Sequence, residues 1–236
     1  YFFARIDKSV TGNAGASAST GSKADTTYVP GLRASADVLD GLNIQGEIAW
    51  QRGNNVTSSA TTINDNERRE AMAAQVIGNY QVPNDILPDV LEEYNPAVKY
   101  VYTYVSGDSN PADRGSANVA GVQNSTNKDT AWDPMLENQG GRTIYSSLFD
   151  LTNTHAHAVS LTANPMEDVT AKVTWTGLWL DKKIDANNGT LALIQPDGTA
   201  AAPATANQQL NTGEDDLGYE IDFDTIYDYT EDVQFG

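Results

Sequence analysis

The sequence predicts an all-β protein, an antiparallel up-and-down transmembrane β-barrel of which about eight strands and a short ninth are visible. Three observations favour this fold class. Apolar and polar side chains alternate over long stretches. Each alternating stretch holds about ten residues, the length that a tilted strand needs to cross a bilayer. The connections between the stretches are alternately short and long, which is typical of outer-membrane barrels.

Composition excludes several other classes of protein. The chain has 236 residues, with 14 Lys and Arg against 32 Asp and Glu, and a formal net charge of −18. A surface this acidic repels nucleic acid, so we expect no nucleic-acid partner. Because there is no cysteine, there is no disulfide framework and no zinc–thiolate site. No apolar run reaches the roughly eighteen residues of a transmembrane helix, but a strand that faces lipid with every second side chain needs no such run.

The clearest alternation lies in residues 27–52. From Leu42 to Trp50 every second residue is apolar or glycine, and the residues between them are Asn43, Gln45, Glu47 and Ala49. Residues 30–38 alternate in the same way, and Asp40-Gly41 between the two runs is a strong hairpin signal. Residues 1–8 also have strand composition. They show neither an initiator methionine nor a cleavage site, so we expect them to lie inside a longer polypeptide.

Five further strands follow from the same alternation, at residues 72–82, 95–108, 157–163, 169–182 and 217–229, and another begins at 233. A compact turn at 83–94 contains one helical turn near 88–93. We expect a single β-barrel domain over residues 1–236, incomplete at both ends. Its long extracellular loops lie near 9–26, 53–66, 109–153 and 183–215.

Aromatic side chains gather near both ends of the predicted strands, as they do in the two interfacial girdles of membrane barrels. On the apolar face, Tyr28, Trp50, Tyr104, Trp179 and Tyr219 lie toward the long loops, and Tyr80, Tyr227 and Tyr229 toward the short turns. A soluble β domain is the alternative, because Tyr and Trp are common in all strands.

Three motifs resemble the alginate export family of outer-membrane porins. They are Tyr102-Thr-Tyr-Val-Ser-Gly-Asp108, then Asn110-Pro-Ala-Asp113, and then Trp132-Asp-Pro-Met135. The late strand at residues 217–224, with Tyr227, is similar to a region near the end of these proteins. The resemblance covers residues 95 to 236. It implies a large monomeric barrel of about eighteen strands in the bacterial outer membrane, of which this chain is a part. A closed eight-stranded barrel, its lumen filled by side chains, is the alternative.

The resemblance also implies a passive channel for an anionic polysaccharide or a related solute, with outer-membrane lipid and lipopolysaccharide around it. If apolar side chains face lipid, charged side chains face the lumen, where rings of charge select permeant ions by sign. The pore-lining candidates are Arg33, Asp37, Glu47, Lys99, Lys172, Lys182, Glu220, Asp222, Asp224 and Asp228.

The sign of the selectivity stays open at this stage. Members of the family that carry polyuronates are expected to have a basic constriction, to which Arg33, Lys99 and Lys172 are the candidates. The four carboxylates of the last long strand make the passage of cations or neutral sugars equally plausible. Arg142, beside a glycine pair in the long loop 109–153, is the candidate for a residue folded into the pore.

The remaining clusters are weaker. His155 and His157 share one face of a strand, but without a third ligand we expect no metal, and we expect no cofactor. Asp108, Asp113 and residues 214–216 are more simply solvated acidic loops than calcium ligands, because they lack the EF-hand spacing.

No nucleophile elbow, phosphate loop or dinucleotide motif is present, so an enzyme, such as a polysaccharide lyase or hydrolase, is not expected. The sequence therefore predicts an outer-membrane channel for small hydrophilic solutes or an anionic polysaccharide. The alternative is a secreted, acidic, β-rich surface or glycan-binding protein. In that case Trp50, Trp175, Phe223 and Tyr227 would pack in a protein core instead of facing lipid.

Overall fold

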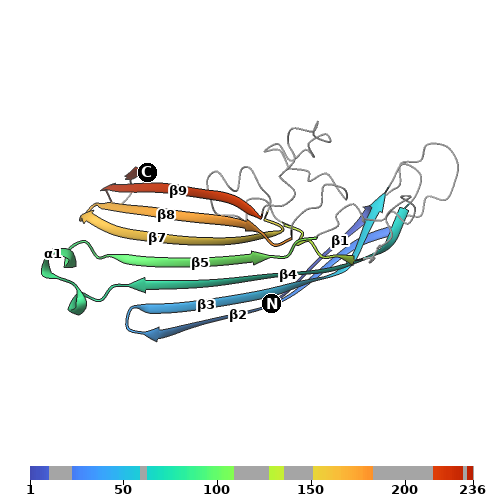
Figure 1. The fold of residues 1–236 in the computed structure, drawn as a ribbon, viewed down its shortest axis with the longest axis horizontal. Coiled ribbons are helices and arrows are strands. Elements are labelled where there is room, and N and C mark those ends of the chain that lie inside the picture. The colour runs from blue at the N-terminus through green and yellow to red at the C-terminus, as the bar shows by residue number, and fades with distance from the viewer. Residues whose placement is uncertain are drawn as a thin grey trace.

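The computed structural model describes residues 1–10, 23–58, 63–108, 128–135, 151–182, 215–230 and 233–235. Over these residues the protein is all-β and forms a single up-and-down sheet (Figure 1). The strand order is β1-β2-β3-β4-β5-β7-β8-β9-β10, and each strand is antiparallel to its neighbours in this order. The two-residue strand β6 pairs with β4 in parallel. The predicted fold class is confirmed at this level.

The strands are β1 (Phe2–Val10), β2 (Lys23–Leu39), β3 (Leu42–Ser58), β4 (Ile63–Gln81), β5 (Ala97–Val105), β6 (Lys128–Asp129), β7 (Thr154–Met166), β8 (Val169–Leu180), β9 (Asp216–Thr230) and β10 (Val233–Phe235). Between β4 and β5 lie a 3-10 turn, η1 (Asn84–Ile86), and one turn of α-helix, α1 (Asp89–Glu92), close to the helical turn predicted there. In the part of the chain that the structure describes, no helix has the length and apolar character to cross a membrane.

The sheet is open. Strand β1 pairs with β2 at one edge and β10 pairs with β9 at the other, and within the described ranges these two edges are not paired with each other. The alternative of a closed eight-stranded barrel is therefore not what the described residues form.

Short connections gather at one end of the sheet. The β2–β3 turn at Asp40-Gly41, the β7–β8 turn and the segment with α1 all lie at the left end in Figure 1. Gly41 has a φ of +75°, and a Cβ there would overlap the carbonyl oxygen of Gln81, so this turn requires glycine. The strand ends that flank the long connections lie at the opposite end of the sheet, as predicted (Figure 1).

The described parts of two expected long loops belong to strands. Val10 of β1 pairs with Lys23 of β2, within the range expected as the loop 9–26. In the range 53–66, only residues 59–62 lie between the two strands, because β3 and β4 stay paired as far as Ser58 and Ile63. Backbone pairing needs no alternation of apolar side chains, so these polar strand ends carry no signal in the sequence. The loop expected at 183–215 lies outside the described residues except for its last position.

The pairing aligns one face across the sheet. A single row runs through Leu32, Ile48, Ala74, Tyr104, His155 and Trp179. We call this face the apolar face. It carries most of the exposed large apolar side chains of the strands, including Phe2, Leu32, Val38, Ile44, Val76, Val159, Leu161, Val173, Trp175, Tyr219, Ile221 and Phe223. The opposite face, which we call the polar face, carries residues such as Arg33, Gln45, Lys99 and Thr174.

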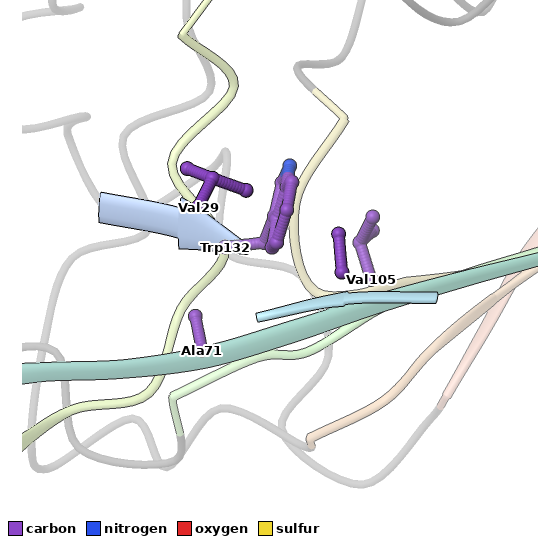
Figure 2. Close-up of a cluster of buried hydrophobic side chains, with 5 residues drawn as sticks. Val29, Ala71, Val105 and Trp132 are labelled. Carbon is purple, nitrogen blue, oxygen red and sulfur yellow. The ribbon is translucent and has the colours of Figure 1, made fainter. Parts of the chain in front are cut away.

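The main cluster of buried apolar side chains lies on the polar face, toward the long connections. It contains Val29, Ala49, Ala71 and Val105, from four neighbouring strands, together with Trp132, which comes from the segment between β5 and β7 (Figure 2). The residues around Trp132, Lys128–Met135, therefore lie against the polar face. We call these eight residues the docked segment.

Candidate functional site

The docked segment begins as a short extension of the sheet. Lys128 and Asp129 form β6 and pair with Arg68 and Arg69 of β4. The Lys128 Nζ atom lies 2.8 Å from Glu70 Oε2, and Arg68 lies 3.6 Å from the other oxygen of the same carboxylate. The hydrogen bond from Lys128, which outweighs the opposing effect of burial, holds the pKa of Glu70 below its ordinary value. Glu70 lies before the apolar stretch of β4 at residues 72–81.

The end of β5 anchors the middle of the docked segment. The Ser106 hydroxyl donates to the Thr130 carbonyl at 2.7 Å, and the Ser106 carbonyl accepts from the Trp132 N–H at 2.8 Å. The Thr130 hydroxyl donates to the Gly107 carbonyl at 2.8 Å, and the Thr130 N–H donates to Asp108 Oδ2 at 3.3 Å. Two of the motifs quoted above, Ser-Gly-Asp and Trp-Asp-Pro, are thus in direct contact in the fold.

Trp132 fills the space between the docked segment and the sheet. Trp132 is only 7% exposed, and Ala71 lies near its indole on the sheet (Figure 2). Ala49 belongs to the same buried cluster, and both alanines are small enough to let the indole approach the strands. Burying a tryptophan removes about 150–250 Å² from water, which stabilises the docked position by about 4–6 kcal/mol before the entropic cost of ordering the segment.

Asp133 makes the charged contacts of the docked segment. Its Oδ2 atom accepts from Arg5 Nη2 at 2.6 Å and from Arg69 Nη1 at 2.9 Å. Its backbone is held as well, because the Gln51 side chain donates to the Asp133 carbonyl at 2.7 Å and accepts from its N–H at 2.9 Å. Gln51 and Arg69 are buried, whereas Arg5 is 39% exposed. The segment is therefore fixed at Asp133 by two ion pairs and one reciprocal amide pair.

The sheet places the two arginines on one row. Arg5 pairs with Thr27, Thr27 with Gly53, and Gly53 with Arg69. The arginines are thus three strand spacings apart, roughly 14 Å between backbones, and their side chains converge on one carboxylate. Gly53 between them has a φ of +144°, and a Cβ there would overlap the Thr26 carbonyl oxygen.

The predicted pore-lining residues fall into three groups. Arg33, Asp37, Glu47, Lys99, Lys172, Glu220, Asp222, Asp224 and Asp228 all lie on the polar face, the same face as the docked segment. Lys182 follows the end of β8 and lies 3.7 Å from Asp181. Arg142 lies outside the described residues, so its predicted place in the pore stays a prediction.

The structure does not gather the predicted basic trio. Arg33 is on β2, Lys99 on β5 and Lys172 on β8, so at least two strand spacings separate each from the next. Arg33 donates to Gln45 at 2.8 Å, and Lys172 forms an ion pair with Asp224 at 2.8 Å. The arginines that do converge are Arg5 and Arg69.

The two histidines lie on the apolar face and bond to tyrosines of β5. The Tyr102 hydroxyl lies 2.8 Å from His155 Nδ1, and the Tyr100 hydroxyl lies 2.8 Å from His157 Nδ1. His155 Nε2 lies 3.4 Å from Asp181 Oδ1. Within the described ranges, no three His, Asp or Glu side chains gather in a way that suits a metal ion.

Sequence reasoning missed four residues of this site: Arg5, Gln51, Arg69 and Asp133. Alternation places Gln51 on the polar side of its strand, and Asp133 stands inside a quoted motif. Neither signal indicates that the two residues meet, because they are 82 positions apart.

The fold and the site define the class of protein by its architecture. It is an open antiparallel sheet with an exposed apolar face and a polar face that binds a segment of its own chain. A comparison with models of known protein families found no match, and neither did a comparison with curated proteins.

Proposed function

We propose that this chain forms part of the wall of an outer-membrane β-barrel channel. The apolar face contacts lipid, the polar face lines a water-filled lumen, and the docked segment narrows that lumen. Small hydrophilic solutes pass by diffusion. The observation that carries the proposal is the sorting of side chains, with exposed apolar groups on one face of eight long strands and polar and charged groups on the other.

The uncovered apolar face favours a membrane over a soluble sandwich. A sandwich buries such a face against a second sheet. In the part of the chain that the structure describes there is one sheet, and Leu32, Ile221 and Phe223 on its apolar face are 64–70% exposed. An apolar surface of this extent needs a partner. Lipid is a fitting partner, because the apolar face extends over every long strand. The long strands other than β1 and β5 have 12–19 residues, more than the roughly ten that cross a bilayer.

Aromatic side chains support the same orientation. Tyr104, His155 and Trp179 form one row of the apolar face near the long connections. Tyr80 and Tyr227 lie at the end with the short turns. These two levels match the two water–lipid interfaces, where amphipathic rings are most stable.

The docked segment and the charges on the polar face suggest how solutes are selected. Arginines concentrate on β1, β2 and β4, while Glu220, Asp222, Asp224 and Asp228 follow one another on β9. Carboxylates therefore predominate at β9, although Lys172 pairs with Asp224, and this excess of negative charge favours cations and neutral sugars over a polyanion. Passage of an alginate-like polysaccharide is the competing outcome, which the following experiment tests.

The experiment is single-channel recording of the full-length protein in a planar bilayer. The reversal potential under a KCl gradient gives the selectivity, and added oligouronate tests for a polyanion site. We expect stable openings, cation selectivity, and a shift toward anions in Asp222→Asn with Asp224→Asn. Glu92→Gln on α1 is the matched control, because Glu92 is outside the polar face. Block by oligouronate would favour the alginate-like solute. Failure to insert, with a monodisperse soluble species, would favour the secreted surface or glycan-binding protein.

A further inference from the structure

We propose that Asp181 is a positioning residue for the docked segment. It holds the peptide group of Gly107 from the side of β8, and Ser106 and Gly107 in turn hold the docked segment. The expected effect on conduction rests on the proposed function, whereas the effect on the position of the docked segment does not.

Asp181 reaches across one strand to the end of β5. It follows β8, and its Oδ2 atom accepts a hydrogen bond from the Gly107 N–H at 2.9 Å. β7 lies between β8 and β5 in the sheet. The Asp181 side chain is only 9% exposed, so this hydrogen bond is largely shielded from competing water.

Asn153 fixes Asp181 in place. Its side chain donates to the Lys182 carbonyl at 3.1 Å and accepts from the Lys182 N–H at 2.8 Å, while the Asp181 N–H donates to the Asn153 carbonyl at 3.1 Å. Asn153 has a φ of +50°, which asparagine tolerates better than most residues. A Cβ on Gly107 would overlap the Asn153 amide. The residue at position 107 can therefore approach Asn153 and Asp181 this closely only because it is glycine.

The peptide groups of Ser106 and Gly107 connect Asn153 and Asp181 to the docked segment. The Ser106 carbonyl accepts from Asn153 at 3.3 Å and from Trp132 at 2.8 Å. The N–H of Gly107 bonds to Asp181, and its carbonyl accepts from the Thr130 hydroxyl at 2.8 Å. A displacement of Gly107 therefore changes the geometry of the contacts that hold Thr130 and Trp132.

The positioning effect and the charge of Asp181 can be separated. Its other oxygen faces His155 Nε2 at 3.4 Å and Lys182 Nζ at 3.7 Å, and the contact with Lys182 depends on charge. The contact with Gly107 needs only an acceptor oxygen. Asn at this position keeps the acceptor and removes the charge, whereas Ala removes both.

The test uses ¹⁹F NMR of the full-length protein in micelles, labelled with 5-fluorotryptophan. The described chain has four tryptophans, and Trp132→Phe assigns the signal of the docked segment. In Asp181→Ala we expect a second Trp132 signal, from an undocked state whose population rises about tenfold for one lost hydrogen bond. Asp181→Asn is expected to keep the native signal. Glu92→Ala, which removes one negative charge from α1 at the far end of the sheet, is also expected to keep the native signal.

Each outcome of the NMR experiment tests whether Asp181 positions the docked segment. An unchanged Trp132 signal in Asp181→Ala would overturn the proposal, and so would an equal disturbance in Asp181→Asn, which would assign the effect to charge. If Asp181→Ala does not fold, Asn153→Gly takes its place, because glycine accepts the positive φ and removes both bonds to Lys182. The same second signal is expected there, and its absence would equally overturn the proposal.

Bilayer recordings of the same variants separate this inference from the proposed function. A second Trp132 signal together with more frequent transitions between conductance levels supports both. A second Trp132 signal with unchanged conductance, or without any channel activity, supports the positioning role and contradicts the narrowing of a lumen by the docked segment.

Discussion

Replacing Asp133 with alanine is expected to loosen the docked segment without unfolding the sheet. The change removes the acceptor of two guanidinium groups and leaves the backbone bonds from Gln51 and Ser106 in place. The Arg69 contact involves a side chain only 5% exposed, so its loss costs about 1.5–3 kcal/mol. The Arg5 contact is more exposed and screened by solvent, and it adds about 0.5 kcal/mol.

The sum, about 2–3.5 kcal/mol, corresponds to a rise of about 30- to 300-fold in the ratio of undocked to docked segment. Native-state hydrogen exchange measures this ratio directly, because the Trp132 and Asp133 amides are bonded only while the segment is docked to Ser106 and Gln51. We expect the protection of these two amides to fall by that factor, while amides in the centre of β3 and β4 keep theirs.

Asp133→Asn is the graded variant. It keeps one acceptor oxygen and loses the charge, so about half of the effect is expected. Glu92→Ala is the matched control, since it also removes one carboxylate. A loss of protection below about fivefold in Asp133→Ala would refute the reasoning that the two arginines hold the segment, and would leave Trp132 as its principal anchor.

Three further predictions address other contacts. Gln51→Leu leaves the N–H and carbonyl of Asp133 unpaired, and should reduce the protection of the docked segment by at least about 2 kcal/mol in the same exchange experiment. Because the pKa of Glu70 is lower in the folded state, its pairing with Lys128 stabilises β6 at pH values above the ordinary value of 4.5 and is lost as the pH falls through the lowered pKa. Exchange in residues 128–129, corrected for the intrinsic rate, should therefore accelerate in acid, and Glu70→Gln should abolish this pH dependence. Leu32→Arg, at a position 67% exposed on the apolar face, should destabilise the protein in lipid vesicles by about 2–4 kcal/mol in urea unfolding, whereas Ser35→Arg on the polar face of the same strand should not; equal effects would contradict the assignment of the faces.

The central parts of the strands could be predicted because a strand with one apolar face shows alternating apolar and polar residues in its sequence. The β2–β3 hairpin turns at Asp40-Gly41 as expected, and Tyr100, Tyr102 and Tyr104 lie on one face of β5. The sorting of the charged candidates onto one face also followed from alternation. The strand ends beyond Gly53 and before Arg68 could not be predicted, because their sequences show no apolar alternation and they pair through their backbones.

The site was mostly beyond sequence reasoning, for a different physical reason. Asp133 meets Arg5 across 128 positions and Arg69 across 64, and no periodic pattern encodes contacts between such distant residues. Trp132-Asp-Pro was recognisable as a motif, but its docking against Ala49 and Ala71 depends on the space those alanines leave on the sheet. Arg142, predicted to fold into the pore, lies outside the described residues and stays a prediction.

The single row that holds Arg5, Thr27, Gly53 and Arg69 has a consequence for the order of folding. A slip of one residue in any of the three strand pairings would turn one arginine to the opposite face, away from Asp133. The ion pairs can therefore form only after β1 to β4 have found their register, and contacts between residues so far apart form slowly. We expect docking to be the last event at this end of the sheet, so that protection of the Trp132 amide marks chains whose first four strands are correctly paired.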